Sequence, residues 1–416
     1  MKVAIAGGGI GGLTLALALH DRGIDVTIFE AVRELRPLGV GLNVLPHGVK
    51  VLFDLGLKDP LVASAIQTKE LFYFDKFGSE IWSEPKGMYA GFDYPQLAIR
   101  RGELHSILLD ACRERLGAEK IRTGHEFQHF EQLDDGRVAC TFADRNADGA
   151  PVIITTDVLV GADGIHSAVR AQLYPKEGEP KWAGQYIWRA VSEAEPFLSG
   201  KTMFMAGPSA TKFIAYPVSQ KHADRGSSLI NWIAEITVDP SQGFPKEDWN
   251  RIGKIEDFMP IFENWDFGWI NIPELIRKAE VIHEFPMVDR DPVDRWSFGA
   301  VTLLGDAAHP MYPNGSNGAS SAILDALALA EALDSDGSVE NALIAYQVDR
   351  LPATTKIVHL NRQRGPEQVL EIADQRAPNG FENIEDVIPR QELEEIAERY
   401  RRVGGFYYAR TEAKQA

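Results

Sequence analysis

The first thirty residues alternate between apolar runs and a glycine-rich turn in the order strand, turn, helix, strand. Residues 3–6 form an apolar run as long as a buried strand, and residues 13–19 alternate Leu with Thr or Ala as a helix. Residues 25–29 form a second apolar strand pattern that ends at Glu30. The pattern predicts a β-α-β unit at the start of the chain, with its turn at residues 7–12.

Two later regions have the patterns of β-strands rich in aromatic residues. Residues 70–75 and 80–82 predict a hairpin, and four strand-like segments follow between residues 181 and 285. Together they predict a large, mostly antiparallel sheet. We expect one of its faces to pack on a core and the other to line a pocket, although alternation alone does not say which is which. The four segments are residues 186–191, 202–205, 213–217 and 228–233.

Helical patterns cover residues 99–116, 338–372 and 390–402. The apolar runs 158–160 and 301–304 are typical of buried strands, and each leads into a turn that contains glycine. Strands and helices therefore alternate around the glycine-rich turns, which favours an α/β fold with a doubly wound sheet.

The turn after the first strand has the glycine spacing of a dinucleotide-binding fingerprint. Gly7 allows a tight turn, Gly9 lets the backbone approach a pyrophosphate, and Gly12 lets the helix pack closely on the sheet. The helix directs its N-terminal N–H groups at the phosphates, and Glu30 is placed to hold the ribose hydroxyls. The alternative is a glycine-rich turn in an ordinary α/β protein. The predicted cofactor contacts of this unit are Gly7, Gly9, Ile10, Gly11, Gly12, Glu30 and Ala31.

Two further motifs follow the other buried strands, at residues 161–167 and 305–310. Asp306 ends a strand, where its carboxylate can accept a hydroxyl of a ribityl chain; capping of the next turn is the alternative. Residues 313–319 form a second glycine-rich turn, and the helix after it would direct its N-terminus at a flavin ring. Gly41 offers backbone that a flavin could approach. The three motifs together predict one FAD site assembled from distant segments.

Two residues of these motifs have alternative interpretations. Asp163 lies in a turn before a helix, so capping of that helix is its alternative to a cofactor role. His309 follows the cofactor loop and precedes a proline. We expect a packed histidine that supports the loop, with general acid or base catalysis as the alternative.

These patterns divide the chain into three parts. We expect a discontinuous FAD-binding domain, a β-sheet domain that binds the substrate, and a C-terminal helical segment. The FAD-binding domain comprises residues 1–70, 98–180 and 286–335, the β-sheet domain residues 71–97 and 181–285, and the helical segment residues 336–416.

Composition excludes several other classes of protein. With 43 basic and 60 acidic residues, the net charge of −17 argues against binding to nucleic acid or to anionic membranes. Two cysteines, Cys112 and Cys140, argue against a disulfide scaffold, a structural zinc site or an iron–sulfur site. No run of 18 apolar residues suggests a membrane span. We expect a cytoplasmic protein without a metal, as a monomer or a homodimer.

The three motifs resemble those of the class A flavoprotein monooxygenases, typified by para-hydroxybenzoate hydroxylase and salicylate hydroxylase. The resemblance covers nearly the whole chain and weakens after about residue 375. It implies that NADH or NADPH reduces FAD, and that reduced flavin reacts with O2 to a C4a-hydroperoxide that hydroxylates an electron-rich aromatic ring. Other segments that carry the resemblance are residues 101–104, 158–170, 286–292 and 317–320.

The resemblance also implies roles for individual residues. Glu30 and Arg101 would hold the adenosine and pyrophosphate side of FAD, and Asp306 the ribityl chain. The carbonyl of Pro313 would lie beside the flavin near the substrate, the only catalytic contact expected, with no side-chain acid or base. The other implied cofactor contacts are Gly318 and Ala319 at the isoalloxazine, and Asp163 in a motif tied to both FAD and NAD(P)H.

Likeness to hydroxylases of carboxylated phenazines implies a planar aromatic or N-heteroaromatic acid as substrate, hydroxylated with or without loss of the carboxylate. The candidate pocket residues are Trp188, Arg189, Lys212, Tyr216 and Pro313.

Two other functions remain open. A flavin-dependent oxidase, reductase or halogenase would keep the fold, although the Trp-x-Trp-x-Ile-Pro signature of halogenases is absent. A binding protein without chemistry, like the Rab GDP-dissociation inhibitors, is disfavoured by the intact Asp306 turn and by Gly315 and Gly318.

Overall fold

A five-stranded parallel sheet lies beneath the predicted cofactor turns in the computed structural model, which describes residues 1–35, 39–239, 241, 251–363 and 367–403. All four strand pairs of the sheet are parallel. Parallel neighbours end at the same edge, so the turns after three of these strands meet there, as ligand sites of doubly wound sheets require. The strand order is β18 (Val301–Leu303), β12 (Val158–Gly161), β1 (Lys2–Ala6), β2 (Asp25–Glu30) and β8 (Ile121–Thr123).

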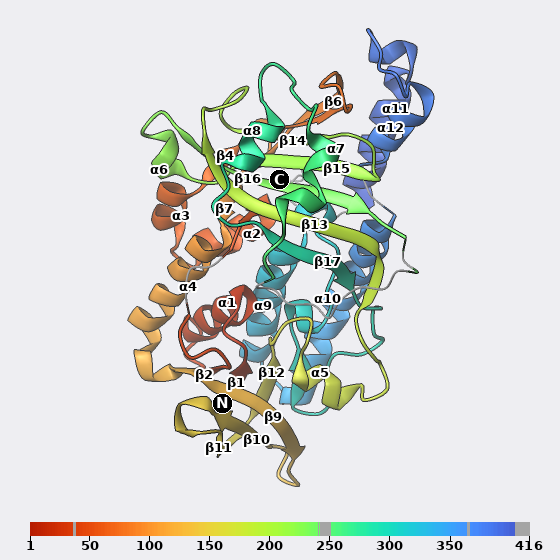
Figure 1. Ribbon diagram of the computed structural model, residues 1–416. Coiled ribbons are helices and arrows are strands. Elements are labelled where there is room, and N and C mark those ends of the chain that lie inside the picture. The colour runs from red at the N-terminus through yellow and green to blue at the C-terminus, as the bar shows by residue number, and fades with distance from the viewer. Residues whose placement is uncertain (36–38, 240, 242–250, 364–366, 404–416) are drawn as a thin grey trace.

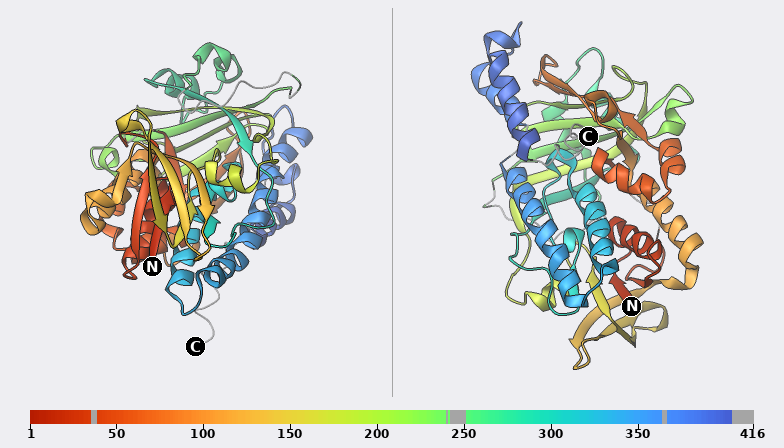
Figure 2. Two further views of the ribbon diagram at one scale, coloured as in Figure 1. Left: turned by 90° about the horizontal axis from the view of Figure 1, so that it is seen from below. Right: turned by 180° about the vertical axis from the view of Figure 1, so that it is seen from behind.

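Helices cover one face of this sheet and a small antiparallel sheet covers the other. The apolar helix predicted over residues 13–19 is α1 (Ile10–His20), buried along most of its length between its neighbours. Figure 2 shows α1, α9 and α10 side by side in its right view. On the opposite face, Phe29 of β2 stacks on Phe142 of β10 with ring centroids 4.1 Å apart. The neighbouring helices are α4 (Arg101–Leu116), α9 (Gly318–Asp334) and α10 (Val339–Arg362), and the small sheet consists of β9 (His125–Gln132), β10 (Val138–Asp144) and β11 (Ala150–Thr156).

A seven-stranded sheet lies across the helices from the parallel sheet (Figure 1). Of its strand pairs, only β14 with β5 is parallel, so the predicted mostly antiparallel sheet is confirmed. The predicted boundary at residue 286 falls inside β17, which pairs with β13 on both sides of that position. The strand order is β17 (His283–Asp289), β13 (Lys181–Ala194), β16 (Ser228–Thr237), β15 (Thr211–Pro217), β14 (Thr202–Ala206), β5 (Glu70–Phe74) and β6 (Glu80–Pro85).

The outer face of this sheet packs on an aromatic core, in which Phe213 stacks on Trp232 at 5.9 Å between ring centroids. Helices α7 (Met259–Phe262) and α8 (Ile272–Arg277) cover that core. The inner face looks toward the cofactor turns. Apolar residues of α11 (Gln368–Arg376) and α12 (Arg390–Val403) pack beside it, near β5 and β14.

The remaining elements connect these layers, and none of the described helices has the length and apolarity that a membrane crossing needs. Residues 404–416 of the predicted C-terminal segment lie outside the described residues. A third antiparallel sheet consists of β3 (Gly41–Val44), β7 (Gln96–Arg100) and β4 (Ile66–Thr68). The other helices are α2 (Pro46–Asp54), α3 (Lys58–Ser64), α5 (Ala168–Leu173) and α6 (Gln220–Ala223).

Both cysteines should be unreactive in the folded protein. Cys112 and Cys140 are fully buried, and burial raises the pKa of each thiol to about 12. The thiolate is the nucleophile that attacks an aromatic disulfide reagent. At pH 8 the native chain should therefore release no aromatic thiol from the reagent, and the denatured chain should release two equivalents, one for each cysteine. Rapid labelling of the native protein would contradict the burial of these side chains.

Candidate active site

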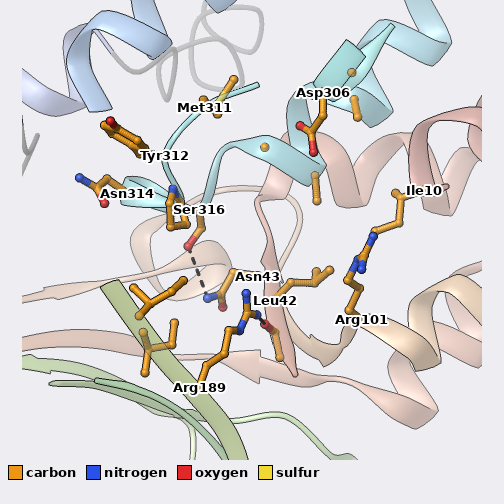
Figure 3. A pocket seen from close by; sticks show the side chains of 18 of the residues that line it. Ile10, Leu42, Asn43, Arg101, Arg189, Asp306, Met311, Tyr312, Asn314 and Ser316 are labelled. Carbon is orange, nitrogen blue, oxygen red and sulfur yellow. Dashed lines mark hydrogen bonds between the residues drawn. The ribbon is translucent and has the colours of Figure 1, made fainter. Parts of the chain in front are cut away.

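A cavity of about 340 Å³ joins the cofactor turns to the inner face of the seven-stranded sheet (Figure 3). Its walls come from segments far apart in the sequence, because the turns after β1, β12 and β18 meet above that face. Of the predicted cofactor and pocket residues, those in its lining are Gly9, Ile10, Gly11, Gly41, Arg101, Arg189, Tyr216, Asp306, Pro313, Gly318 and Ala319.

The three fingerprint glycines have different surroundings. Gly7 has a φ of +111°, and a Cβ there would lie 2.3 Å from the carbonyl oxygen of Ala162. A Cβ at Gly12 would lie 2.2 Å from the carbonyl oxygen of Gly7. A Cβ at Gly9 would meet no atom of the described residues within 4 Å. Gly7 and Gly12 are thus needed for the packing of the turn itself, whereas Gly9 leaves open space above the N-terminus of α1.

No described side chain caps the N-terminus of α1, so its first N–H groups are available to an anion. Glu30 lies beside this turn at the end of β2. Its carboxylate accepts hydrogen bonds from the backbone N–H of Gly8 at 2.7 Å and of Val32 at 2.8 Å. The half-buried Ala31 follows Glu30, and its carbonyl accepts a hydrogen bond from Arg145. This position beside the turn is compatible with the ribose role expected for Glu30.

Asp306 follows β18, and its side chain is exposed at the cavity wall (Figure 3). The protein around it raises the pKa of this carboxyl by desolvation, although His309 and Arg101 partly oppose that effect. A carboxylate that faces the cavity gains from hydroxyl donors that a ligand supplies.

A buried ion cluster supports the Asp306 turn from below. Asp325 of α9 is fully buried and accepts hydrogen bonds from the Nε of Arg350 at 2.9 Å, from the N–H of Gly305 at 3.2 Å and from His309. His309 is therefore packed against the loop, as expected. Asp325 was not among the predicted site residues, and its one signal in the sequence is that it is a single acid in the apolar stretch 322–330 of α9.

Asp163 turns its carboxylate toward α5, where it accepts hydrogen bonds from the backbone N–H of Ala168 at 2.7 Å and of Val169 at 3.3 Å. This is the capping geometry that we considered as the alternative. Its neighbours Ala162 and Gly164 line the cavity. A role of Asp163 toward FAD and NAD(P)H stays a prediction.

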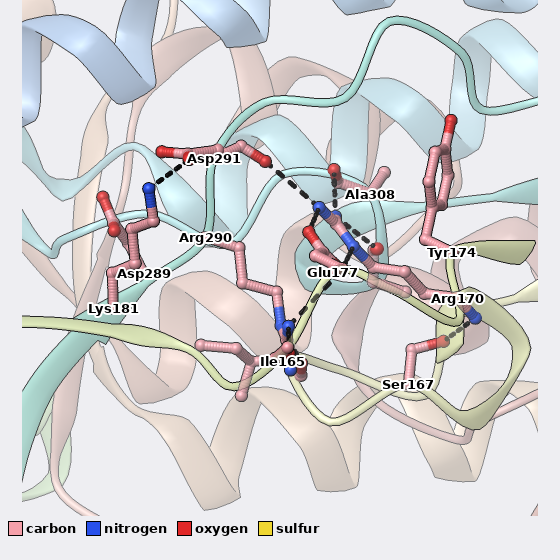
Figure 4. Close-up of polar contacts among 12 residues, drawn as sticks. Ile165, Ser167, Arg170, Tyr174, Glu177, Lys181, Asp289, Arg290, Asp291 and Ala308 are labelled. Atoms are coloured by element: carbon pink, nitrogen blue, oxygen red, sulfur yellow. Dashed lines mark hydrogen bonds and ion pairs between the residues drawn. The ribbon is translucent and has the colours of Figure 1, made fainter. Parts of the chain in front are cut away.

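Arg170 links the motif at residues 161–167 to the motif at residues 305–310 through hydrogen bonds (Figure 4). Its buried guanidinium donates hydrogen bonds to the carbonyl oxygens of Ala307 at 3.0 Å and Ala308 at 2.8 Å, and its Nε donates to Glu177 at 2.8 Å. Glu177 also pairs with Arg290. Arg170 had no predicted role. Because arginine is almost never fully buried, the sequence around it gives no signal that this side chain lies in the interior.

The β-strand register decides which predicted pocket residues reach the cavity. Arg189 lies on the inner face, whereas its neighbour Trp188 points to the outer core, where it stacks on Phe258 with ring centroids 5.2 Å apart. Lys212 is buried behind Glu235 and Glu367, and its ammonium pairs with both carboxylates. The structure thus brings Arg189 and Tyr216 to the cavity and places Trp188 and Lys212 away from its surface.

Arg189 is a poorly solvated cation. One of its terminal nitrogens donates to the carbonyl oxygen of Gly41 at 3.1 Å, and its buried Nε has no hydrogen-bond partner among the described residues. Burial lowers the pKa of Arg189 to about 10, so it still carries its charge at neutral pH. Burial also raises the pKa of Tyr216 to about 12 and keeps its hydroxyl neutral. Together they offer donors to an anionic group of a ligand.

The opposite wall is the loop before α9 (Figure 3). Pro313 is exposed at the cavity, and a Cβ at Gly318 would meet no described atom within 4 Å. Asn361 of α10 fixes this loop, because its side-chain Nδ2 donates to the carbonyl oxygen of Tyr312 at 2.8 Å and its backbone carbonyl accepts from the side chain of Asn314 at 3.0 Å.

Comparison with known proteins agrees with this geometry. A family model described as an FAD binding domain matches residues 1–361. The chain is 48% identical over 365 residues to phenazine 1,6-dicarboxylic acid hydroxylase PhzS of Lysobacter antibioticus, with 87% of this chain and 89% of the relative covered. It is 33% identical to a 3-amino-4-hydroxybenzoate 2-monooxygenase of Streptomyces platensis, with 88% of each chain covered. The crystal structure of Klebsiella pneumoniae HpxO with FAD and uric acid shares the fold, with a TM-score of 0.74 at 23% identity over 95% of this chain and 97% of that one.

Proposed function

The chain belongs to the FAD-binding-domain family of flavin-dependent aromatic hydroxylases, and from this premise we propose that it hydroxylates a planar, phenazine-like N-heteroaromatic carboxylic acid. It is an FAD-dependent monooxygenase, and NAD(P)H and O2 are its co-substrates. One observation carries the proposal of substrate: the cavity that contains the cofactor turns continues into an apolar space with Arg189 at its floor.

The residues present fit FAD. A Cβ added at Gly9 or at Gly318 would meet no described atom within 4 Å, so both residues leave open space at the cavity. No described side chain caps the N-terminus of α1 or of α9, which begin at these turns. The turn at residues 9–12 would hold the pyrophosphate, with Glu30 and Arg101 on the adenosine side. Asp306 would hold the ribityl chain, and residues 318–319 the isoalloxazine. When bound, FAD supplies the activation of O2.

The protein's own contribution is to bind and orient the substrate and to exclude water. Arg189 would hold the carboxylate, since a desolvated guanidinium binds carboxylates strongly. Five aliphatic and methionine side chains on the inner face form an apolar surface against which a planar ring can lie. These are Ile187, Met203, Met205, Ile214 and Ile233. An apolar pocket also limits wasteful loss of activated oxygen to water.

The substitution Asp306→Ala should weaken FAD retention and leave the chain folded, because the side chain faces the cavity rather than the core. Hydrogen bonds to a charged group contribute about 1.5–3 kcal/mol, so the Kd for FAD should rise roughly 10- to 150-fold. Flavin fluorescence during titration of the apoprotein measures this. A variant that holds FAD as tightly as the wild type would show that the flavin lies elsewhere.

The proposed substrate class is tested with the FAD-loaded protein in the presence of O2. NADH and NADPH consumption is followed with benzoates, pyridine carboxylates and phenazine carboxylates. A phenazine acid should accelerate consumption and gain one oxygen atom by mass, and trapping of CO2 shows whether the carboxylate leaves. If only single-ring acids are hydroxylated, the phenazine assignment is wrong; consumption without an oxygenated product from any acid would exclude the whole proposed class.

Two coarser expectations accompany this proposal. With both cysteines buried and unpaired, the cytoplasm is the compartment we propose. A monomer or a homodimer remains a prediction.

A further inference from the structure

Ser316, in the loop before α9, contributes a hydroxyl to the cavity wall, and Asn43 of β3 contacts it (Figure 3). The Oγ of Ser316 accepts a hydrogen bond from Nδ2 of Asn43 at 3.5 Å. The Oδ1 of Asn43 accepts one from Nε2 of Gln96 at 3.5 Å, and its Nδ2 also contacts Sδ of Met203 at 3.8 Å. Gln96 and Met203 thus hold the amide of Asn43 with its amino group, and not its oxygen, toward Ser316.

The backbone of Ser316 adopts a left-handed conformation, with a φ of +59°, directly after Gly315 at +72°. Of the three described residues other than glycine that have a positive φ, Ser316 is the one that lines the cavity. A side chain costs free energy in this conformation, whereas glycine adopts it readily. Residues held in this way against their preference concentrate at ligand sites. The side chain of Ser316 is therefore a candidate for contact with a ligand rather than for packing alone.

The hydroxyl of Ser316 keeps one unused donor. A serine hydroxyl has one hydrogen to donate and two lone pairs that accept. The hydrogen bond from Asn43 uses one lone pair, and Ser316 donates no hydrogen bond to any described residue. Ser316 is half-buried at the cavity wall, so its hydrogen is available to an acceptor atom of a ligand there. The cavity thus offers a neutral donor at this position, in contrast to the charged donors of Arg189.

Strand β3 also sets the spacing between this hydroxyl and Arg189. The guanidinium of Arg189 donates to the carbonyl oxygen of Gly41 at 3.1 Å, and Asn43 lies two residues further along the strand. Two residues of a strand span about 7 Å. An atom directly beside a carboxylate held by Arg189 is therefore remote from Ser316. An acceptor on the far side of the same ring system lies nearer to that hydroxyl.

We propose that Ser316 determines specificity by donating a hydrogen bond to a ring nitrogen of the substrate, on the side of the central ring remote from the carboxylate, and that Asn43 positions its hydroxyl. This inference rests on the proposed function, which assigns the carboxylate to Arg189. A ring nitrogen accepts the hydrogen and completes the contacts of the hydroxyl. A C–H group at the same place would leave the donor unsatisfied, which weakens binding.

The test compares three planar acids of equal ring size and charge on the FAD-loaded enzyme at pH 8. Phenazine-1-carboxylate has ring nitrogens both beside and remote from its carboxylate, acridine-1-carboxylate has only the remote one, and acridine-4-carboxylate has only the neighbouring one. Dissociation constants come from the change that each acid causes in the flavin absorbance. The first two acids should bind equally within about twofold, and acridine-4-carboxylate about three- to tenfold more weakly, as the loss of one hydrogen bond implies.

Substitutions of Ser316 assign this preference to its hydroxyl. Ser316→Ala should bring the constants of the two acridine acids to within about twofold of each other, because the donor is removed. Ser316→Gly should do the same without lowering the melting temperature, since glycine adopts a positive φ readily. Ser335→Ala is the matched control and should leave the preference intact. Ser335 is an exposed serine at the other end of α9, and its Oγ donates to the carbonyl oxygen of Ala332 at 2.6 Å.

Asn43→Asp tests the positioning role with almost no change of shape. A carboxylate has no N–H to donate and would accept the hydroxyl hydrogen of Ser316 instead. The preference for acridine-1-carboxylate should then fall as in Ser316→Ala, although the serine is intact. A general loosening of the cavity would weaken both acridine acids and leave their ratio unchanged, and this result would overturn the role of Asn43.

The outcomes separate this inference from the proposed function. If acridine-4-carboxylate binds as tightly as acridine-1-carboxylate while phenazine-1-carboxylate stimulates NAD(P)H oxidation, the inference is wrong and the proposed function stands. The inference is also wrong if Ser316→Ala raises the Kd for FAD and leaves the ratio of the acridine acids unchanged, because the hydroxyl would then serve the cofactor. If none of the three acids perturbs the flavin, the proposed substrate class is wrong and the inference falls with it.

Discussion

Replacing Asp325 with asparagine should lower the free energy of unfolding by about 3–5 kcal/mol, because breaking a buried ion pair leaves the other charge uncompensated. Asp325 is fully buried, and its partner Arg350 is 13% exposed. The variant should also release FAD more readily, since the backbone of Gly305 and the ring of His309 lose a charged acceptor. Urea denaturation measures the stability, and flavin retention on a desalting column measures the second effect.

Glu331→Gln provides a control on the same helix. Glu331 is 59% exposed, and its oxygen lies 3.7 Å from Arg22, so this pair should contribute less than about 1 kcal/mol. Equal losses of stability in the two variants would mean that the cluster around Asp325 is not formed as described.

The Asp325 contribution should also depend on pH. Burial raises the pKa of Asp325, but His309 and Arg350 outweigh burial and hold it below its ordinary value. The stabilisation by the Asp325 carboxylate is therefore complete above the pKa of aspartate in the unfolded chain, about 3.9. It is lost as pH falls toward the lower pKa of Asp325 in the folded protein. The difference in stability between the wild type and Asp325→Asn should be constant near neutral pH and should narrow below about pH 4.

Local patterns predicted the β-α-β unit at the start of this protein. The β-α-β unit could be predicted because its strand, turn and helix are contiguous, and each has its own steric requirement. The structure adds a distinction that spacing alone does not make: Gly7 and Gly12 avoid collisions with the protein backbone, while Gly9 leaves open space. The fold class is confirmed, and so is FAD as the cofactor.

The substrate side could be predicted only in part, because it depends on register and on distant segments. The alternation of β13 indicated that Trp188 and Arg189 lie on opposite faces, but not which face meets the cavity. Lys212 was a reasonable candidate as a cation in a strand. Its ammonium forms ion pairs with Glu235 on the next strand and with Glu367, which is more than 150 residues away in the sequence. No local pattern in the sequence indicates these ion pairs.

The substitution Gly9→Val should weaken FAD binding without unfolding the protein. Gly9 has an ordinary extended conformation, with a φ of −75°, and its Cβ position opens into space free of described atoms. The Cβ of a valine therefore meets no described atom within 4 Å, yet the side chain would occupy the volume over the N-terminus of α1 where the pyrophosphate would lie. Overpacking of this kind costs about 1–3 kcal/mol, or roughly 5- to 150-fold in the Kd for FAD.

Gly12→Val gives the contrasting result, since its Cβ would lie 2.2 Å from a backbone oxygen that cannot move independently. This variant should lose stability itself and melt at a lower temperature even as the apoprotein. The comparison therefore separates two roles that the fingerprint combines. Apoprotein melting unchanged in Gly9→Val and lowered in Gly12→Val would assign space for the ligand to the first glycine and packing of the helix to the second. Unchanged FAD affinity in Gly9→Val would mean that the pyrophosphate does not cross this turn.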